Sequence, residues 1–462
     1  MSTQPAHSPL QAGAAQVDIC PPMGTQIAGD IGRLRPAEFT RDPLYARALV
    51  LRRGERTACI LSTDLLAIAS EHAAEIRRRV ADALETEVGA ILLHDTQTHA
   101  APALGHFMLT EHTPYIPPEY SWLRGGDDRF VPLGIERIVQ AARLAAECLQ
   151  AVSVGAASGI EARVAFNRRF VMRDGCVSTH PATGSPLIRY AEGPIDPEVG
   201  IVCFTTPELR TVAMLLHHTC HPVHGYPEHW LSSGWPGAWC EGMRAACGGE
   251  CVPMVLNGCC GNIHHNNHLD PTHVDDYHRM GALLTETALK ATTRLVYEQD
   301  PILDWRTTHL RIPLRSVPAA ELDAASRLLA QHPEPMWLDQ EHTRLDWDWY
   351  FAVGLLDMEE LRKRTPEIDY EIQVLRLGNI ALVGLPGEPF VEGQLRIKIE
   401  SPTYPTYVAH HCNQAEGYIP TAYALNSGGY ETRTCLSSKL APQALDSIAD
   451  AAGALLRETF GT

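Results

Sequence analysis

Histidine is concentrated at the ends of apolar runs in this sequence. Four runs, AILL, VAMLL, VPMVL and IALVG, lead into HDTQTHAAP, HHTCHPVHGYPEH, NGCCGNIHHNNH and LPGEP. Functional sites of open α/β sheets gather at the carboxyl ends of strands, so these four motifs are expected to converge. The side chains that they offer are His94, His99, His217, His218, His221, His224, His229, His264, His265, His268 and Glu388.

Imidazole and carboxylate together suit zinc. A catalytic zinc commonly takes about three protein ligands and keeps one position for water, which then ionises near neutral pH. A lone histidine at a strand end is more often a hydrogen-bonded structural residue, but the five histidines of the second motif are harder to explain that way. Spacing does not show which of them bind, and the HExxH motif of helix-borne zinc proteases is absent from the sequence.

Other catalytic motifs are missing. The sequence has no GxSxG nucleophile elbow, no GxxxxGK[ST] phosphate loop and no GxGxxG turn between a strand and a helix. The adjacent Cys259 and Cys260 could supply a nucleophile beside a histidine, but two small buried hydrophobic side chains are the favoured interpretation. Metal-assisted chemistry is therefore preferred.

Composition and charge narrow the class of protein. Of the 462 residues, 45% are hydrophobic and 20% charged, which is normal for a globular protein with a large core. The net charge of −17 argues against nucleic-acid binding, which needs Lys and Arg opposite phosphates. No apolar run approaches the roughly 20 residues that span a bilayer, and residues 1–16 lack the pattern of a secretory signal. Thirteen scattered cysteines are interpreted as reduced thiols, so we expect a cytoplasmic protein.

The elements that must position these motifs follow an α/β pattern. Strands are predicted at Tyr45–Leu51, Thr57–Thr63, Ala90–Leu93, Val212–Leu216, Val252–Leu256 and Ile380–Gly384, the first two as a hairpin. Helices are predicted from Ser70, as its cap, and over Ile135–Ala151 and Pro442–Thr459. The predicted fold class is therefore α/β, with mixed sheets flanked by helices.

Two segments are candidates for covering a site. Residues 300–375 hold a predicted helix, Ala319–Gln331, and an aromatic stretch from Trp337 to Tyr350. They form either a helical subdomain or lid, or a helical hairpin that packs its tryptophans into the core. The loop from Leu104 to Val131 is rich in Pro, Gly and aromatic residues and is a second candidate rim, since loops of this length are usually functional or disordered.

A series of longer motifs runs in order through the sequence. It begins at AAQVDICPPMG and DPLYARALVL, continues through TQTHAAP, FNRR, GPIDPEVGIV and HTCHP, and ends with LPGEPFVEGQLRIK and NQAEGYIPTAYALNSGGYE. In these motifs the chain resembles the neutral/alkaline non-lysosomal ceramidase family, specifically its N-terminal catalytic domain, from about Gly13 to Glu431. The resemblance implies one ceramidase-like, metal-dependent hydrolase domain over residues 10–462.

The resemblance further implies one zinc ion per chain, held by His99, His221, Glu388 and Tyr430. A phenol titrates near pH 10, so Tyr430 would bind as an anion only beside a cation, or would instead donate a hydrogen bond to a developing oxyanion. The first histidine of the family's THTHSGP-type motif is Gln97 here, which leaves His99 as the ligand in that motif.

Departures from the family bear on the substrate. The family's Ser-Asn-x-Gly-Asp stretch, which carries its proposed catalytic serine, is Asn257–Asn262 here and holds no serine. Gly234 stands where relatives often carry aspartate, and the chain ends at Thr462, without the C-terminal immunoglobulin-like domain of ceramidases. A smaller, more polar amide, ester or lactone is therefore at least as good a candidate substrate as ceramide.

The predicted function is that of a zinc-dependent hydrolase, ceramidase-like or amidase-like, that cleaves an acyl C–N or C–O bond of a small soluble substrate with metal-activated water. Tyr430 and a nearby imidazole would stabilise the oxyanion. The candidates for protonating the leaving group are His264, His265 and His218. The candidates for substrate contact are Asn262, Asn257, Asn167 and Arg168, the last two explained equally well by a turn or a salt bridge.

Two other classes of protein remain open. The polar HHNNH segment suits a metal-dependent lyase or isomerase that acts on a polyhydroxy or sugar-acid substrate. A zinc site without an open coordination position would instead indicate a non-catalytic, metal-stabilised binding protein. The sequence does not define the oligomeric state.

Overall fold

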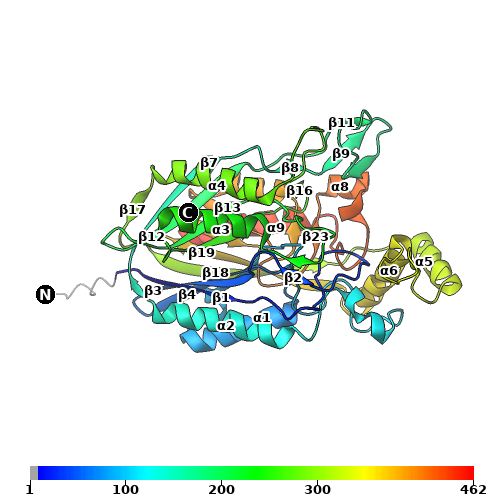
Figure 1. Ribbon diagram of the computed structural model, residues 1–462, viewed down its shortest axis with the longest axis horizontal. Coiled ribbons are helices and arrows are strands. Elements are labelled where there is room, and N and C mark those ends of the chain that lie inside the picture. Colours follow the sequence, from blue (N-terminus) through cyan, green and yellow to red (C-terminus); the bar gives the residue numbers. More distant parts are fainter. Residues whose placement is uncertain (1–8, 462) are drawn as a thin grey trace.

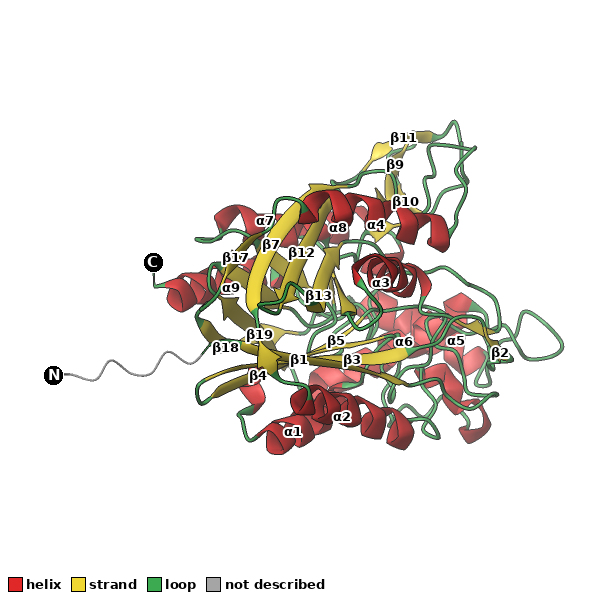
Figure 2. Ribbon diagram, turned by 60° about the vertical axis from the view of Figure 1, so that its left-hand side comes forward, coloured by secondary structure: helices red, strands yellow, loops and turns green. Residues whose placement is uncertain are grey.

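The computed structural model describes residues 9–461. Two sequence expectations therefore lie partly outside the described residues: the lack of a secretory signal in residues 1–16, and the end of the predicted domain at Thr462. Three sheets, each with helices on its outer face, account for most of the fold (Figure 2).

The first sheet contains the predicted hairpin and has the strand order β5-β4-β3-β1-β6. Its strands are β1 Gln11–Asp18, β3 Tyr45–Arg53, β4 Arg56–Thr63, β5 Ile91–Asp95 and β6 Gln150–Ala151. β3 and β4 pair antiparallel, as predicted, and β5 joins β4 in parallel. The helices α1 Ser70–Leu84 and α2 Val131–Glu147 share an apolar core with these strands and cover the outer face of the sheet.

Three ends of these two helices differ from the prediction. The cap of α1 is Ala69, without a side-chain hydrogen bond, whereas the Ser70 hydroxyl accepts from the backbone N–H of Ala415. α2 starts earlier than predicted, at Val131, and the last residues of its predicted range pair with β1 instead. Tertiary contacts, which periodicity does not show, bind Ser70 and the pair Gln150 and Ala151 instead.

The second sheet has the order β15-β13-β12-β7-β17. Its strands are β7 Ser153–Ile160, β12 Glu198–Thr205, β13 Thr211–His218, β15 Val252–Asn257 and β17 Val296–Glu298. The helices α3 Gly234–Cys247 and α4 Tyr277–Thr292 pack on its outer face. β13 and β15 lie parallel, and β13 runs two residues beyond its predicted end, so that His217 and His218 belong to the strand itself.

The third sheet has the order β18-β19-β20-β22. Its strands are β18 Leu303–Pro313, β19 Glu367–Leu377, β20 Ile380–Gly384 and β22 Thr406–Ala409, and its outer face is covered by α7 Val391–Glu400 and α9 Ala444–Phe460. The range of β20 is the predicted one. β18 and β19 lie within residues 300–375, so the helical part of that segment is confined to the stretch between them.

The three sheets share one apolar core. The first sheet contributes Leu49, Leu51 and Ile60, the second Val202, Phe204 and Leu215, and the third Leu375, Leu377 and Leu382. Burial of such side chains is the dominant favourable contribution to folding, so this core holds the three sheets in a defined arrangement. The predicted class, α/β with mixed sheets flanked by helices, is confirmed.

Each sheet contains one parallel pair of strands, and these pairs bring the four histidine and glutamate motifs together. The pairs are β4–β5, β13–β15 and β20–β22. The loop with His99 follows β5, the loop with His221 follows β13, and the turn with Glu388 follows β20. The backbone N–H of His410, just after β22, donates to the carbonyl oxygen of Asn257 at the end of β15 (3.1 Å). The strand ends of different sheets therefore meet.

Two helices, α5 Ala319–Gln331 and α6 Trp347–Arg364, stand out to one side of the sheets (Figure 1). α5 has the predicted range. α6 buries Trp349 in an apolar cluster that includes Leu123 of the long loop Leu104–Val131. The helical pair and the long loop, the two candidates for covering a site, therefore pack against each other.

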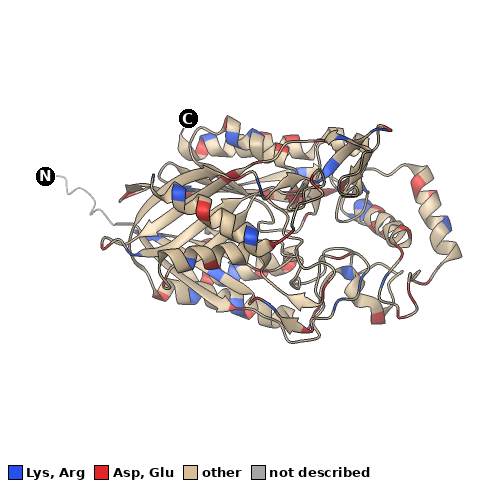
Figure 3. Ribbon diagram, turned by 45° about the horizontal axis from the view of Figure 1, so that its top comes forward, with Lys and Arg blue, Asp and Glu red and all other residues tan. Residues whose placement is uncertain are grey.

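Shorter elements complete the fold. They are β2 Phe39–Thr40, β8 Phe166–Asn167, β9 Arg169–Met172, β10 Val177–Thr179, β11 Ile188–Ala191, β14 Trp230–Leu231, β16 Ile263–His264, β21 Glu388–Pro389, β23 Tyr418–Ile419, α8 Ala422–Ser427 and the 3-10 turns Val88–Ala90, Pro118–Arg124 and Tyr430–Thr432. Charged residues of both signs fall mainly on helices and loops (Figure 3). Within residues 9–461, no helix combines the length and the apolar character that crossing a membrane requires.

Candidate metal centre and its pocket

A pocket lies where the strand-end loops meet α6 and the long loop. Its polar lining includes Gln97, His99, Glu388, His411 and Tyr430, and its apolar lining includes Ala28, Ile31, Leu66, Phe107, Trp122, Leu123 and Tyr350. Gln97 and His411 have φ angles of 64° and 47°, which residues other than glycine rarely adopt and which recur at functional sites. An apolar pocket with a few convergent polar groups is the usual form of a small-molecule site.

His99 and His221 meet with their Nε2 atoms 2.9 Å apart. The Nδ1 atom of each ring lies beside a backbone carbonyl oxygen, that of Gly29 at 2.8 Å for His99 and that of Cys260 at 3.4 Å for His221. A ring nitrogen that donates to a carbonyl carries the proton, so in a neutral imidazole the other nitrogen has a lone pair. When Nδ1 carries the proton in both rings, the two Nε2 atoms face each other as two acceptors.

Burial keeps both imidazoles neutral. Desolvation, with a contribution from Arg35, lowers the pKa of His99 to about 3, and desolvation lowers the pKa of His221 well below its usual value. Gly29 has a φ angle of 90°, and a Cβ atom at this position would lie 2.7 Å from His99 Nδ1. Glycine is therefore required here for the backbone carbonyl to reach the ring.

Glu388 lies between two imidazoles. Its Oε2 atom is 3.9 Å from His221 Nδ1, and its Oε1 atom is 3.8 Å from His411 Nε2. Oε2 is buried and has no hydrogen-bond partner among residues 9–461, which is costly unless a cation or a proton meets it. His99, His221 and Glu388 are nevertheless more widely spaced than a compact metal site. Their ligand atoms do not all lie within 4.8 Å of one another.

His411 is a pocket residue that the sequence analysis did not single out. Its Nδ1 atom forms an ion pair with Asp95 Oδ1 (2.8 Å). Burial works to lower its pKa, but Asp95 and Glu388 outweigh burial and raise the pKa to about 10. A signal was present, because His410 and His411 directly follow the apolar strand β22, as the other histidine motifs follow theirs.

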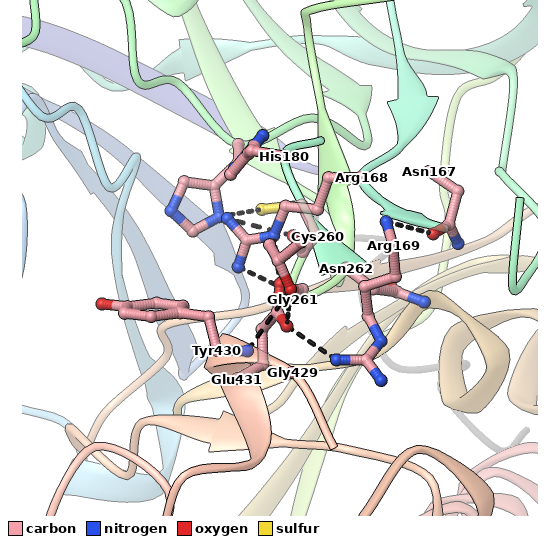
Figure 4. Close-up of polar contacts among 12 residues, drawn as sticks. Asn167, Arg168, Arg169, His180, Cys260, Gly261, Asn262, Gly429, Tyr430 and Glu431 are labelled. Atoms are coloured by element: carbon pink, nitrogen blue, oxygen red, sulfur yellow. Dashed lines mark hydrogen bonds and ion pairs between the residues drawn. The ribbon is translucent and has the colours of Figure 1, made fainter. Parts of the chain in front are cut away.

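Tyr430 is anchored through its neighbour Glu431, which is fully buried. Glu431 Oε1 pairs with Arg168 Nε and Oε2 pairs with a guanidinium nitrogen of Arg169, both at 2.8 Å (Figure 4). The Thr179 hydroxyl donates to Oε2, also at 2.8 Å. These contacts hold the turn that presents Tyr430 to the pocket.

The ring of Tyr430 packs against α6. Its centroid lies 5.9 Å from that of Trp347 and 6.3 Å from that of Phe351. Burial raises the pKa of Tyr430 well above its usual range, so the phenol keeps its proton in the metal-free protein. Tyr430 can therefore act as a hydrogen-bond donor in the pocket.

Asn257 and His94 tie the strand ends together. The Asn257 amide donates to the carbonyl oxygens of Thr96 (3.3 Å) and Cys220 (3.0 Å) and accepts from the N–H of Cys220 (3.2 Å). His94 Nδ1 donates to the carbonyl oxygen of His410 (2.7 Å), and its Nε2 accepts from the N–H of Asn257 (3.0 Å). This network joins β5, β15 and the end of β22. Asn257 was predicted to contact substrate. Its side-chain amide instead forms hydrogen bonds with the backbone of Thr96 and Cys220.

The other three residues predicted to contact substrate are more than nine-tenths buried and do not line the pocket. Asn262 accepts from the N–H of Val391 (3.0 Å), Asn167 donates to the carbonyl oxygen of Pro194 (3.0 Å), and Arg168 donates to that of Gly261 (2.7 Å). These contacts favour a role in holding the loops around the pocket.

The three predicted proton donors also lie outside the pocket lining. His218, in β13, donates to the carbonyl oxygen of Glu198 (3.0 Å). His264 Nδ1 accepts from the N–H of Asn266 (2.9 Å), and His265 lies beside Asp275. Of the predicted metal ligands, His99, Glu388 and Tyr430 therefore line the pocket and His221 contacts His99, whereas the predicted proton donors face other neighbours.

The cysteines are unpaired throughout the described residues. Burial raises the pKa values of Cys259 and Cys260 far above the usual range. A buried thiol that keeps its proton is a weak nucleophile, so the interpretation of this pair as two small hydrophobic side chains is favoured.

Three sheets around one core, with imidazole and carboxylate side chains at the strand ends, form a fold similar to that of solved ceramidases. The structure matches the neutral ceramidase from Pseudomonas aeruginosa with a TM-score of 0.73 and 17% sequence identity, over 98% of this chain and 74% of that chain. A ceramidase complexed with C2 matches with a TM-score of 0.70 and 15% identity, over 98% of this chain and 75% of that chain. No family model and no curated protein matches the sequence. The predicted ceramidase-like fold is confirmed, and residues 9–461 contain no immunoglobulin-like domain.

Proposed function

We propose that the protein is a zinc-dependent hydrolase that cleaves an acyl C–N or C–O bond of a small-molecule substrate. An amide is the first choice, because the solved structures that share its fold are ceramidases, which are amide hydrolases. The observation that carries the proposal is the approach of His99 Nε2 to His221 Nε2, two lone pairs 2.9 Å apart at the edge of a pocket. When both Nδ1 atoms carry the proton, a shared cation satisfies this pair of nitrogens.

The residues present fit zinc. His99 and His221 offer neutral nitrogens, Glu388 offers a buried carboxylate oxygen without a partner, and Tyr430 lines the same pocket. Imidazole nitrogen and carboxylate oxygen are the usual ligands of catalytic zinc. When bound, the ion would polarise the substrate carbonyl and lower the pKa of a water molecule.

The protein's own groups orient the substrate and stabilise charge. Tyr430 holds its proton and donates a hydrogen bond to the carbonyl oxygen as that oxygen becomes negative. His411, paired with Asp95, lies beside Oε1 of Glu388, and Oε2 of the same carboxylate lies 3.9 Å from His221 Nδ1.

The pocket favours a substrate with a compact apolar or aromatic group beside the scissile bond. Phe107, Trp122 and Leu123 of the long loop form an apolar wall, and Tyr350 of α6 adds to it. This differs from the polar substrate expected from the HHNNH segment, because the histidines of that segment lie outside the pocket lining. It also weakens the case for a lyase or isomerase that acts on a polyhydroxy compound.

Metal analysis and a substrate panel test the proposal. In protein purified without chelator, His221→Ala should lose about one equivalent of zinc and all hydrolysis of N-acyl amines, esters and lactones with apolar acyl groups. His229→Ala, a change in the same motif at a partly exposed histidine, is the control and should alter neither. Zinc content unaffected by His221→Ala would contradict the metal site. A fully metal-loaded protein that turns over no member of the panel would contradict the hydrolase.

A further inference from the structure

A second group of candidate metal ligands lies apart from the pocket, at His224, His265 and Asp275. Each side chain offers one ligand atom, and these three atoms all lie within 4.8 Å of one another. Within residues 9–461, no other set of three His, Cys, Asp or Glu side chains meets this distance. None of the three residues lines the pocket, and none is among the ligands proposed for the pocket ion.

Asp275 Oδ1 is the point where the two imidazoles meet. It lies 2.6 Å from His265 Nδ1 and 3.0 Å from His224 Nε2. Despite the short distance, His265 Nδ1 is not aligned as a hydrogen-bond donor to this oxygen. Neither nitrogen of His265, nor Nδ1 of His224, has a hydrogen-bond partner in the described part of the chain. Both rings are about nine-tenths buried or more, and buried polar nitrogens of native proteins normally have a partner.

Protonation of both rings would not stabilise this cluster. The two rings stack, with centroids 3.5 Å apart and an interplanar angle of 19°. If both were protonated, two like charges would face each other in a buried place with one carboxylate between them. A neutral imidazole has a lone pair on one of its two nitrogens, so each ring can present one to a cation.

The ligand set selects the kind of ion. Two imidazole nitrogens and one carboxylate oxygen suit zinc and neighbouring divalent transition metals, whereas calcium and magnesium prefer oxygen ligands throughout. The side chain of Asp275 is 44% exposed, while that of His265 is 5% exposed. An ion can therefore enter from the aspartate side and complete its coordination with water.

We propose that His224, His265 and Asp275 bind a divalent transition-metal ion, zinc by preference, separate from the pocket ion. His224 lies on the loop that carries His221, and His265 follows His264, whose backbone bridges to that of His221. Asp275 immediately precedes Asp276, the N-cap of α4. The ion therefore fastens the loop bearing a pocket ligand to the segment that leads into α4. This inference does not depend on the proposed hydrolase activity.

Zinc content per chain tests the inference in the full-length protein. The wild type should hold two equivalents, Asp275→Asn one and His221→Ala one, because each variant removes a different site. His278→Ala, on the exposed first turn of α4, is the matched control and should hold two. If zinc content is unchanged in Asp275→Asn, the second site is wrong. If only His221→Ala leaves it unchanged, the pocket ion is wrong and the second site stands.

Titration of metal-free protein with zinc gives a second measurement. The wild type should show two binding phases, and Asp275→Asn should weaken one of them at least about 100-fold, since even partners outside the ligand sphere typically affect affinity 10–100-fold. If Asp275→Asn fails to fold, the second site can still be measured in the His221→Ala protein, which keeps His224, His265 and Asp275. With Co²⁺ this protein should show the visible absorption bands of a coordinated ion, and their absence would overturn the inference.

Discussion

Replacing Glu431 with glutamine removes a negative charge that forms two buried ion pairs. Its carboxylate is fully buried and pairs with Arg168 and Arg169, each at 2.8 Å. Removing one partner from a buried ion pair typically costs about 3–5 kcal/mol, because the remaining charge stays buried without compensation. Arg169 retains its ion pair with Glu192 and glutamine retains one acceptor oxygen, so the lower end, about 3 kcal/mol, is expected.

Urea unfolding and steady-state kinetics measure the two consequences of Glu431→Gln. The unfolding midpoint should fall by an amount that corresponds to this loss in unfolding free energy. The kcat for the best substrate of the panel should also fall, because the turn that presents Tyr430 loses its anchor. Glu286→Gln, in the exposed i,i+4 pair with Lys290, is the matched control and should change neither quantity.

Two results would refute this reasoning in different ways. An unchanged unfolding midpoint would show that the buried ion pairs of Glu431 do not stabilise the fold. A lowered midpoint with full kcat would show that these pairs stabilise the protein without positioning Tyr430.

Three further outcomes are expected. Tyr430→Phe should lower kcat about 100-fold with little change in KM, whereas Tyr423→Phe at an exposed site should change neither; equal kinetics for both would contradict the donor role of Tyr430. Gly29→Ala places a methyl group 2.7 Å from His99 Nδ1 and should weaken zinc binding at least about tenfold in calorimetric titration; unchanged affinity would contradict the close approach. Burial lowers the pKa of His94 to about 3 from a usual value of 6.5, so below pH 6.5 the unfolded chain binds a proton that the fold does not. Stability should therefore fall between about pH 6.5 and 3, by up to about 1.4 kcal/mol per pH unit for this group, and urea unfolding should show a shallower pH slope in His94→Gln.

The parts of the fold that the sequence predicted are those with strong periodicity. β20 and α5 have the predicted ranges, since a short apolar run and a regular 3.6-residue pattern each determine their own element. β18 and β19 were not predicted as strands. β18 has the sequence LDWRTTHLRIP, in which polar and charged residues alternate with few buried ones, so its partner strand rather than its own hydrophobicity defines it. Pairing of this kind is not visible in a single sequence.

The candidate site also has a part that the sequence predicted and a part that depends on tertiary packing. Motifs identified His99, His221, Glu388 and Tyr430, and the structure brings these residues to one pocket or its edge. The role of Asn257 depends on which loops surround its amide, and that is decided by the packing of separate sheets. The apolar wall of the pocket comes from the long loop and α6, which carry no motif.

The junction of strand ends around His94 and Asn257 has a consequence for how the protein matures. His99 follows a strand of the first sheet, His221 one of the second and Glu388 one of the third. A nascent chain that has completed only the first two sheets lacks the carboxylate, and long-range contacts of this kind form late because loop closure must come first. Capture of the proposed pocket ion should therefore be among the last events of biosynthesis, so truncated or half-assembled chains would remain metal-poor.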